Sequence, residues 1–465
     1  MHRMRSWHHP WNYAGTPMLD AMRQALLALG ARAQTEEIIR DTRRLRGLAI
    51  SLFRKPEKIG DNLADFQETI ELHARETASW ITPERMKAGE RGPFDACDLR
   101  IWILLAEAAS VPFVPAREIL RLSEDELASA SGFVGLPDDL VTRGLRRRMA
   151  TVFDGREEAH AEAEAADVDP DRLEERLYAA MDDVPEGWMV RGVRSGSLEL
   201  KALAGAGLAG PQAPEVRFGP SLEVGPGWIR HGNRRRVNVS DNRTISSFAQ
   251  GPGGDAVFVA RPWVEAARFA LGPDPHRHGT PFAGKGMWPA EWRAFVERGK
   301  VVGISSYYGW CGNVSRENAL VAMEVRDLAQ AIVDQARLMG MIPRYMDVEF
   351  ARAAGRPEHA AALELFAPDQ VACTLDFIEV KDRGLMLLEG GPPNTPFGGG
   401  HPCAFAGCGG LPKFGNKTIT EGVAFRLMPH VVMADPRTWE DGERSDCILS
   451  WEEVEALASR PVAEP

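Results

Sequence analysis

The segment "TLDFIEVKDRGLMLLEGGPPN" (374–394) contains two short apolar runs, and each run carries an acidic residue. The turn-forming tetrapeptide "KDRG", with glycine last, separates the runs, and this pattern predicts a β-hairpin. The simplest register pairs Val380 with Leu385, Ile378 with Leu387, and Asp376 with Glu389. Because side chains alternate between the two faces of a strand, all six are then expected on one face of the sheet.

The two acidic residues of this hairpin, Asp376 and Glu389, predict a cation site. Directly opposed residues have Cβ atoms roughly 4.5–5.5 Å apart. Two carboxylates about 5 Å apart repel by about 3 kcal/mol at an effective dielectric constant of about 20. A divalent cation reverses the sign of this interaction, and Mg²⁺ takes one or two carboxylates plus substrate phosphates. We therefore expect the pair to bind Mg²⁺ and to add nothing to stability on its own. The alternative is two exposed acids, or a register slip that separates them.

Two further segments place charged residues on strands. In "EWRAFVERGKVVGISSYY" (291–308), Glu291 and Arg293 share one face of a predicted hairpin, which is costly unless they meet another charge. An internal salt bridge is the alternative. In "WMVRGVRSGSLELKALAGAG" (188–207), Arg191 lies on a strand and Lys201 follows a Gly-Ser loop. Cations beside such a loop suit phosphate oxygens.

Composition indicates an ordinary soluble globular protein. The chain has 465 residues, enough for two or three domains, with 44% hydrophobic and 26% charged residues. A formal net charge of −11 argues against a general nucleic-acid binder, so no nucleic acid partner is expected. No apolar run is long enough to span a bilayer, and the first residues lack a secretory signal. These features predict a cytoplasmic protein without a membrane partner, whose six cysteines are thiols.

The predicted secondary structure changes from helical to β-rich near Trp188. Before it, helical patterns predominate, at 18–54, after Thr82, at 94–109, after the capping box of 123–126 and at 155–181. After it, short β-rich runs are broken by Gly and Pro, apart from one long amphipathic helix at about 315–340. Strands separated by turns predict antiparallel sheets and an α+β class. Beyond 436 we expect a surface segment with one helix in "SWEEVEALAS" (450–459).

The order of these pieces resembles the ATP-grasp superfamily over roughly residues 110–410. It is most similar to a clade of this superfamily that is widespread in phages and bacteria. In these proteins the first lobe carries an arginine followed by a lysine. The resemblance implies two α+β lobes with antiparallel sheets gripping ATP, preceded by a mostly helical N-terminal region. The implied divisions are a helical domain (1–110), a first lobe with a helical insertion (111–262), a second lobe with the metal site (263–435) and a tail (436–465).

The resemblance also implies a role for each candidate residue. Arg191 and Lys201 would contact phosphates. The linker between the two lobes (260–263), with Ala260, Arg261 and Trp263, would contact adenine through its backbone. Arg293 would face the phosphates or an acyl phosphate, with Glu291 beside it as the second catalytic residue. Asp376 and Glu389 would hold the metal. Family members commonly place a third ligand, asparagine, where this chain has Gly391, so either Asn394 reaches the metal instead or one ligand is lost.

The function implied is an ATP-dependent carboxylate–amine ligase, with ATP and Mg²⁺ as cofactors and an acyl phosphate as intermediate. Its substrates would be a small-molecule or peptide carboxylate and an amine, the acceptor binding near 395–415 with His401 and Lys413. A nucleotide-binding module without turnover that acts on a protein partner is the main alternative. A zinc hydrolase using His401, Cys403 and Cys408 is another, and the sequence leaves the oligomeric state open.

Overall fold

The computed structural model describes the protein over thirteen stretches of chain. These are residues 75–122, 179–180, 183–185, 188–194, 227–229, 255–273, 285–307, 314–353, 355, 360–395, 398–406, 419–427 and 445–461. The expected helices at 18–54, the capping box at 123–126 and nearly all of the 155–181 segment lie outside them, as do Lys201, Cys408 and Lys413. Among the helices described, none combines the length and hydrophobicity needed to cross a bilayer.

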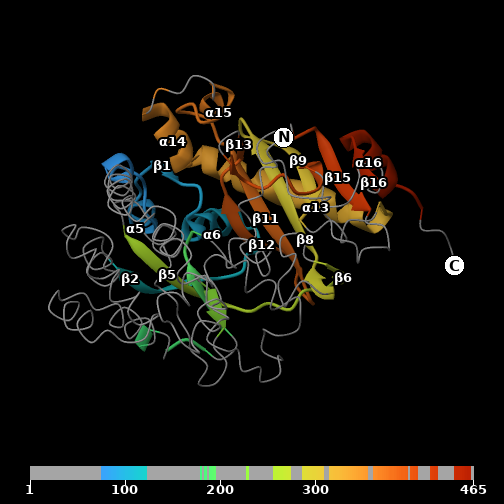
Figure 1. The fold of residues 1–465 in the computed structure, drawn as a ribbon, viewed down its shortest axis with the longest axis horizontal. Coiled ribbons are helices and arrows are strands. Elements are labelled where there is room, and N and C mark those ends of the chain that lie inside the picture. Colours follow the sequence, from blue (N-terminus) through green and yellow to red (C-terminus); the bar gives the residue numbers. More distant parts are fainter. Residues whose placement is uncertain are drawn as a thin grey trace, which may run out of the picture.

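The larger of two main sheets has six strands, in the order β12-β11-β8-β9-β15-β16 (Figure 1). The strands are β8 (Glu291–Glu297), β9 (Lys300–Ser306), β11 (Cys373–Val380), β12 (Gly384–Gly391), β15 (Gly422–Leu427) and β16 (Ser445–Leu449). Both predicted hairpins, β8–β9 and β11–β12, are present. The sheet is mixed rather than purely antiparallel, because β9 and β15 run parallel.

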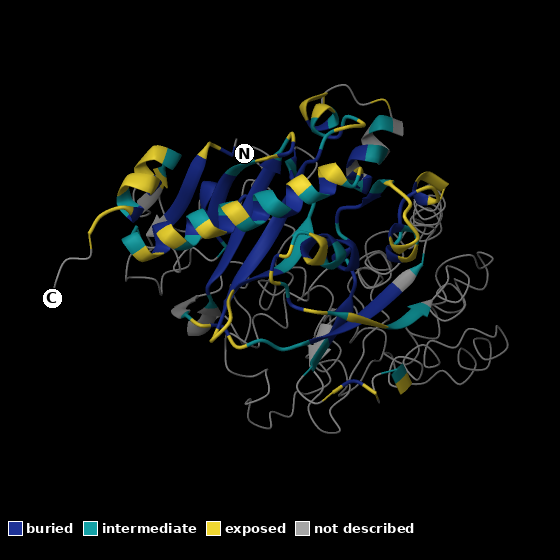
Figure 2. Ribbon diagram, turned by 180° about the vertical axis from the view of Figure 1, so that it is seen from behind, coloured by how far each residue is buried: buried dark blue, intermediate teal, exposed yellow. Residues whose placement is uncertain are grey.

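One face of this sheet is covered by α13 (Arg316–Leu338), the long helix predicted from the sequence, which begins after the N-cap Ser315 (Figure 2). Apolar side chains of the strands and the helix form a common core: Trp292, Ala294, Val296, Leu375, Phe377, Ala329, Ile332 and Val333. The opposite face therefore carries Arg293 and Asp376, the residues that alternate with this core. The helix α16 (Trp451–Ala458) packs beside α13, so the C-terminal residues are part of this layer rather than a separate surface segment.

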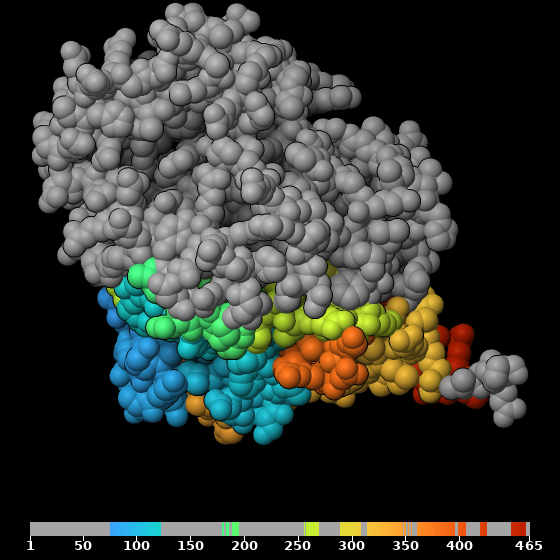
Figure 3. All heavy atoms as spheres, turned by 90° about the horizontal axis from the view of Figure 1, so that it is seen from below, coloured from blue at the N-terminus to red at the C-terminus, as the bar shows by residue number. Residues whose placement is uncertain are grey.

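The smaller sheet is antiparallel, with the order β2-β5-β3-β4. Its strands are β2 (Arg117–Leu122), β3 (Trp188–Gly192), β4 (Gly227–Ile229) and β5 (Ala256–Pro262). After β5 the chain passes to the larger sheet, where Ala266 pairs with Val380 and the amide of Ala267 donates to Glu379 O at 2.7 Å. The space-filling view shows these linker residues against the end of the β11–β12 hairpin (Figure 3). The overall class is thus α+β, as predicted.

A short N-terminal unit lies beside both sheets. It contains α5 (Pro83–Lys87), capped by Thr82 as predicted, then β1 (Gly92–Asp95) and α6 (Leu99–Ala108). Strand β1 pairs in parallel with β10 (Met341–Arg344), so the described part of this unit contains a strand besides its two helices. The remaining elements are β6 (Phe269–Pro273), β7 (Lys285–Pro289), α14 (Met346–Ala353), α15 (Ala360–Leu365), β13 (Asn394–Thr395), β14 (Gly398–Gly399) and η6 (Cys403–Ala406).

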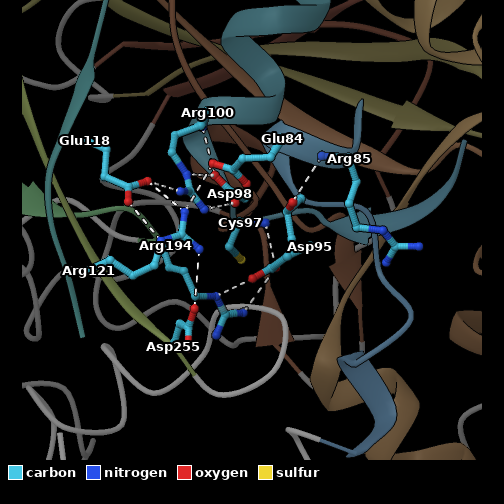
Figure 4. Close-up of polar contacts among 11 residues, drawn as sticks. Glu84, Arg85, Asp95, Cys97, Asp98, Arg100, Glu118, Arg121, Arg194 and Asp255 are labelled. Carbon is cyan, nitrogen blue, oxygen red and sulfur yellow. Dashed lines mark hydrogen bonds and ion pairs between the residues drawn. The ribbon is translucent and has the colours of Figure 1, made fainter. Parts of the chain in front are cut away.

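Ion pairs join the N-terminal unit to the smaller sheet (Figure 4). Arg194, after β3, lies 2.6 Å from a carboxylate oxygen of Asp95 at the end of β1. Three further contacts cross between elements: Arg100 with Glu118, Arg121 with Glu84, and Arg121 with Asp255. The first three of these pairs connect α5, α6 and β1 with β2 and the end of β3, so the two parts are expected to behave as one body, whereas the pair of Arg121 with Asp255 lies within the smaller sheet.

Helix α6 also contacts β12, the strand that carries Glu389, through Trp102. The indole donates to Ala96 O at 2.8 Å and lies edge-on to Phe94. A Cβ atom at Gly390 would lie 2.4 Å from this indole, closer than side chains tolerate. Gly390 therefore lets α6 approach the backbone immediately after Glu389.

We expect Gly390→Ala to destabilise the protein by about 1–3 kcal/mol through this overlap. Gly391→Ala is the matched control, because its Cβ would meet only the Thr374 hydroxyl, at 3.1 Å. Urea unfolding of both variants measures the difference. Equal losses for the two variants would contradict the contact with Trp102.

Candidate active site

Three charged residues form a row across neighbouring strands of the larger sheet. Arg293 of β8 is aligned with Asp376 of β11, and Asp376 is aligned with Glu389 of β12. The predicted pairing of the two carboxylates is therefore confirmed. The rest of the predicted hairpin register is wrong, because Val380 pairs with Gly384 and Ile378 with Met386.

A bulge at Leu388 explains the difference. The pairing passes from Asp376–Glu389 to Phe377–Leu387, so Leu388 is an extra residue on β12. Leu385 and Leu387 consequently pack in the core beneath α13, instead of sharing a face with Asp376.

The carboxylate of Asp376 is neutralised by Arg293 within the same sheet. Arg293 Nε and Nη2 donate to the two oxygens of Asp376, both at 2.6 Å, and both side chains are buried. Burial acts to lower the pKa of Arg293, but the charge and hydrogen bonds of Asp376, together with Cys403 and Tyr307, act in the opposite direction and hold the pKa well above its ordinary value. The internal salt bridge considered as an alternative is thus present, with Asp376 rather than Glu291 as the described partner.

Glu389 is paired with a residue from the other sheet. Arg191 of β3 donates through Nη1 to Glu389 Oε2 at 2.5 Å, and Arg191 Nε donates to Gly192 O. The two carboxylates therefore do not simply repel each other, since each has its own guanidinium. This ion pair and the hydrogen bond from Arg261 to Leu388 O both join the two sheets.

Arg261, near the end of β5, lies close enough to Glu389 for their charges to interact. Its side chain is buried, and burial together with the charge of Arg191 lowers its pKa to about 9, with Glu389 acting in the opposite direction. Ala260 pairs with Arg117 on one side and Val190 on the other, so its backbone does not lie at an open sheet edge. A backbone contact with adenine is accordingly expected beyond β5, near Trp263, rather than at Ala260.

Residues 392–395 and 398–406 bond to the charged face. Thr374 Oγ1 donates to Pro392 O at 3.0 Å, Arg293 Nη1 donates to His401 O at 3.1 Å, and the amide of Ala404 donates to Ser305 Oγ at 2.8 Å. His401, expected near the acceptor, is thus brought to Arg293. The guanidinium of Arg293 also lies over the ring of Tyr307, 4.8 Å from its centroid.

Two predicted site residues have other surroundings. Asn394 Nδ2 donates to Gly400 O at 3.1 Å, which ties it into its own loop. Glu291 is buried two residues before Arg293 on the same strand, as predicted. Within the described ranges, no three His, Cys, Asp or Glu side chains gather closely enough to hold a metal ion by themselves.

Sequence reasoning did not identify the pairing partners of the carboxylates or the side-chain role of Arg261. The only signal for close packing here was "GG" at 390–391, which marks a strand that another element approaches closely. Contacts between residues 191 and 389 carry no local signal, because nothing in either segment specifies the other.

The ion pairs overturn the expectation that the carboxylates add nothing to stability. We expect Asp376→Ala to lower the free energy of unfolding by about 3–5 kcal/mol, because it leaves Arg293 buried without its charge partner. Glu265→Ala is the control, since its pair with Lys381 is exposed and contributes little. Urea unfolding in the presence of a chelator measures both, and wild-type stability of Asp376→Ala would contradict the prediction.

No family model matches the chain, and no curated protein matches its sequence.

Proposed function

We propose that the protein is an ATP-grasp enzyme that binds Mg-ATP between its two main sheets and joins a carboxylate to an amine through an acyl phosphate. The observation that supports this most is the meeting of Arg191, from one sheet, with the Arg293–Asp376–Glu389 row of the other. The proposal includes the two-lobed ATP-grasp architecture, the helical N-terminal region and a cytoplasmic location.

The chemistry of the donor set fits this cofactor. Asp376 and Glu389 supply two carboxylates in register on neighbouring strands, and Mg²⁺ in phosphate-binding sites takes one or two. Arg191 and Arg293 supply planar guanidinium groups, which bind phosphate oxygens through paired hydrogen bonds. When the cofactor binds, the guanidinium groups would turn to phosphate oxygens and leave both carboxylates to the cation.

Each group of the site has a proposed task in the ligase reaction. Mg²⁺, when bound, neutralises charge on the phosphoryl group that is transferred. Arg191 and Lys201 bind the phosphates, and Arg293 orients the transferred group, with Glu291 beside it as the second catalytic residue. Residues 392–395 and 398–406, which bond Thr374 and Arg293, lie on this face and help to exclude water from the acyl phosphate.

One observation favours nucleotide binding without turnover. Position 391 has no side chain and supplies no third metal ligand, and the side-chain Nδ2 of Asn394 is bonded to Gly400 O, which leaves only Asn394 Oδ1 as a candidate ligand. Such a module would act on a protein partner through its N-terminal region.

Measurement of ADP release over a panel of acids and amines tests the ligase proposal. We expect release that depends on both substrates and stops in excess chelator. Tight ATP binding without release for any pair would favour the non-catalytic alternative, and the absence of Mg-dependent ATP binding would exclude both.

Arg191→Lys is expected to weaken ATP binding clearly, because ammonium cannot replace the planar fork of guanidinium at phosphate. Lys201→Ala should weaken binding at least as strongly. Calorimetry on both variants provides the measurement. Arg121→Lys, which changes an arginine in the ion-pair cluster of Figure 4, is the control and should bind ATP as wild type does. Unchanged affinity in Lys201→Ala would remove the assignment to the arginine–lysine clade.

A further inference from the structure

The bulge at Leu388 determines where Glu389 points. Without the bulge, the pairing seen near the turn would continue along β12, and Leu388 would lie opposite Asp376. Because side chains alternate, the glutamate would then lie on the α13 face, away from Asp376. The alignment of the two carboxylates therefore depends on a local irregularity that must itself be held in place.

Arg261 contacts the backbone at this irregularity. Its Nη1 donates to Leu388 O at 2.9 Å and its Nη2 donates to Val114 O at 3.0 Å. The segment with Val114 runs parallel to β12, with bonds from Leu387 N to Pro112 O and from Val114 N to Leu387 O. One guanidinium thus links the carbonyl of the bulged residue to the chain beside it.

We propose that Arg261 is a positioning residue, which holds the bulge at Leu388 and thereby aims Glu389 at Asp376. The link between Arg261 and the bulge stands on the contacts above, whereas the use of Glu389 as a cation ligand rests on the proposed function.

The surroundings of Arg261 support a geometric role. The side chain is 1% exposed and lies near the like charge of Arg191, and its Nε has no hydrogen-bond partner. A buried cation in such a place is costly, and an apolar side chain would fill the space at lower cost. What the guanidinium adds is a rigid fork that bonds two carbonyl groups from separate segments.

Hydrogen exchange of the ligand-free protein tests the link. We expect Arg261→Lys to speed exchange of the β12 amides by about ten-fold or more, the effect of losing one or two hydrogen bonds from a charged donor. Arg261→Gln, which keeps one amide donor without the charge, is the second variant if the lysine variant does not fold. Unchanged β12 exchange in the folded variant would overturn the inference.

Arg344→Lys is a matched control. Arg344 is also buried, and it too donates to backbone carbonyls, at Ala367 and Gln370, but these lie outside the β11–β12 hairpin. Burial likewise lowers its pKa, to about 10. The control should lose stability and leave β12 exchange unchanged. Faster β12 exchange of equal size in both variants would reduce Arg261 to a general contribution to stability and overturn its positioning role.

Affinity for Mn²⁺ in the presence of ATP separates the inference from the proposed function. If wild-type protein binds Mn²⁺, we expect Arg261→Lys to bind it about 10- to 100-fold more weakly than Arg344→Lys does, as for other residues that orient metal ligands. Equal affinity would overturn the positioning role. If wild-type protein binds no Mn²⁺ but β12 exchange depends on Arg261, the proposed function is wrong and the positioning role stands.

Discussion

The need to neutralise buried charge governs how the two sheets meet. Asp376 lies in the middle of a sheet, where an unpaired carboxylate would be strongly destabilising, and Arg293 on the next strand neutralises it. Glu389 continues the same row on β12. It accepts a hydrogen bond from Arg191 of the other sheet, so the charged row of the larger sheet extends across the contact between the two sheets.

The surrounding backbone is arranged to permit this contact. The bulge at Leu388 turns Glu389 toward Asp376, and the absence of a side chain at Gly390 lets Trp102 pack against the strand just beyond. Arg261 then bonds the bulge to the segment around Val114. Three neighbouring residues of β12 thus have different roles. Leu388 shifts the pairing register, Glu389 carries the charge, and Gly390 leaves space for Trp102 of α6.

The sequence predicted those features that depend on local pattern. Alternation and turn residues indicated both hairpins, the Thr82 cap indicated the start of α5, and the amphipathic pattern indicated α13. The Asp376–Glu389 pairing was correct although the register nearer the turn was not, because a bulge shifts pairing without changing the hydrophobic composition of the strand. The arginine partners could not be predicted, since a salt bridge between residues 191 and 389 depends on how two sheets pack and not on either segment alone.

In the proposed function, the ligands must compete with the ion pairs, because the cation and the phosphate bind the same carboxylates and guanidinium groups that now bind each other. A cation alone would have to displace Arg191 and Arg293 from the carboxylates and leave both guanidinium groups buried without a partner. A phosphate alone would attract the guanidinium groups and leave two carboxylates facing each other. Both costs vanish when cation and phosphate arrive together, because each charged group then exchanges one partner for another. Since Arg191 belongs to one sheet and Glu389 to the other, this exchange also replaces a direct contact between the sheets by one that passes through the nucleotide. The proposed site would therefore favour the complex of the metal with ATP over either component, and would couple its binding to the relative position of the two sheets.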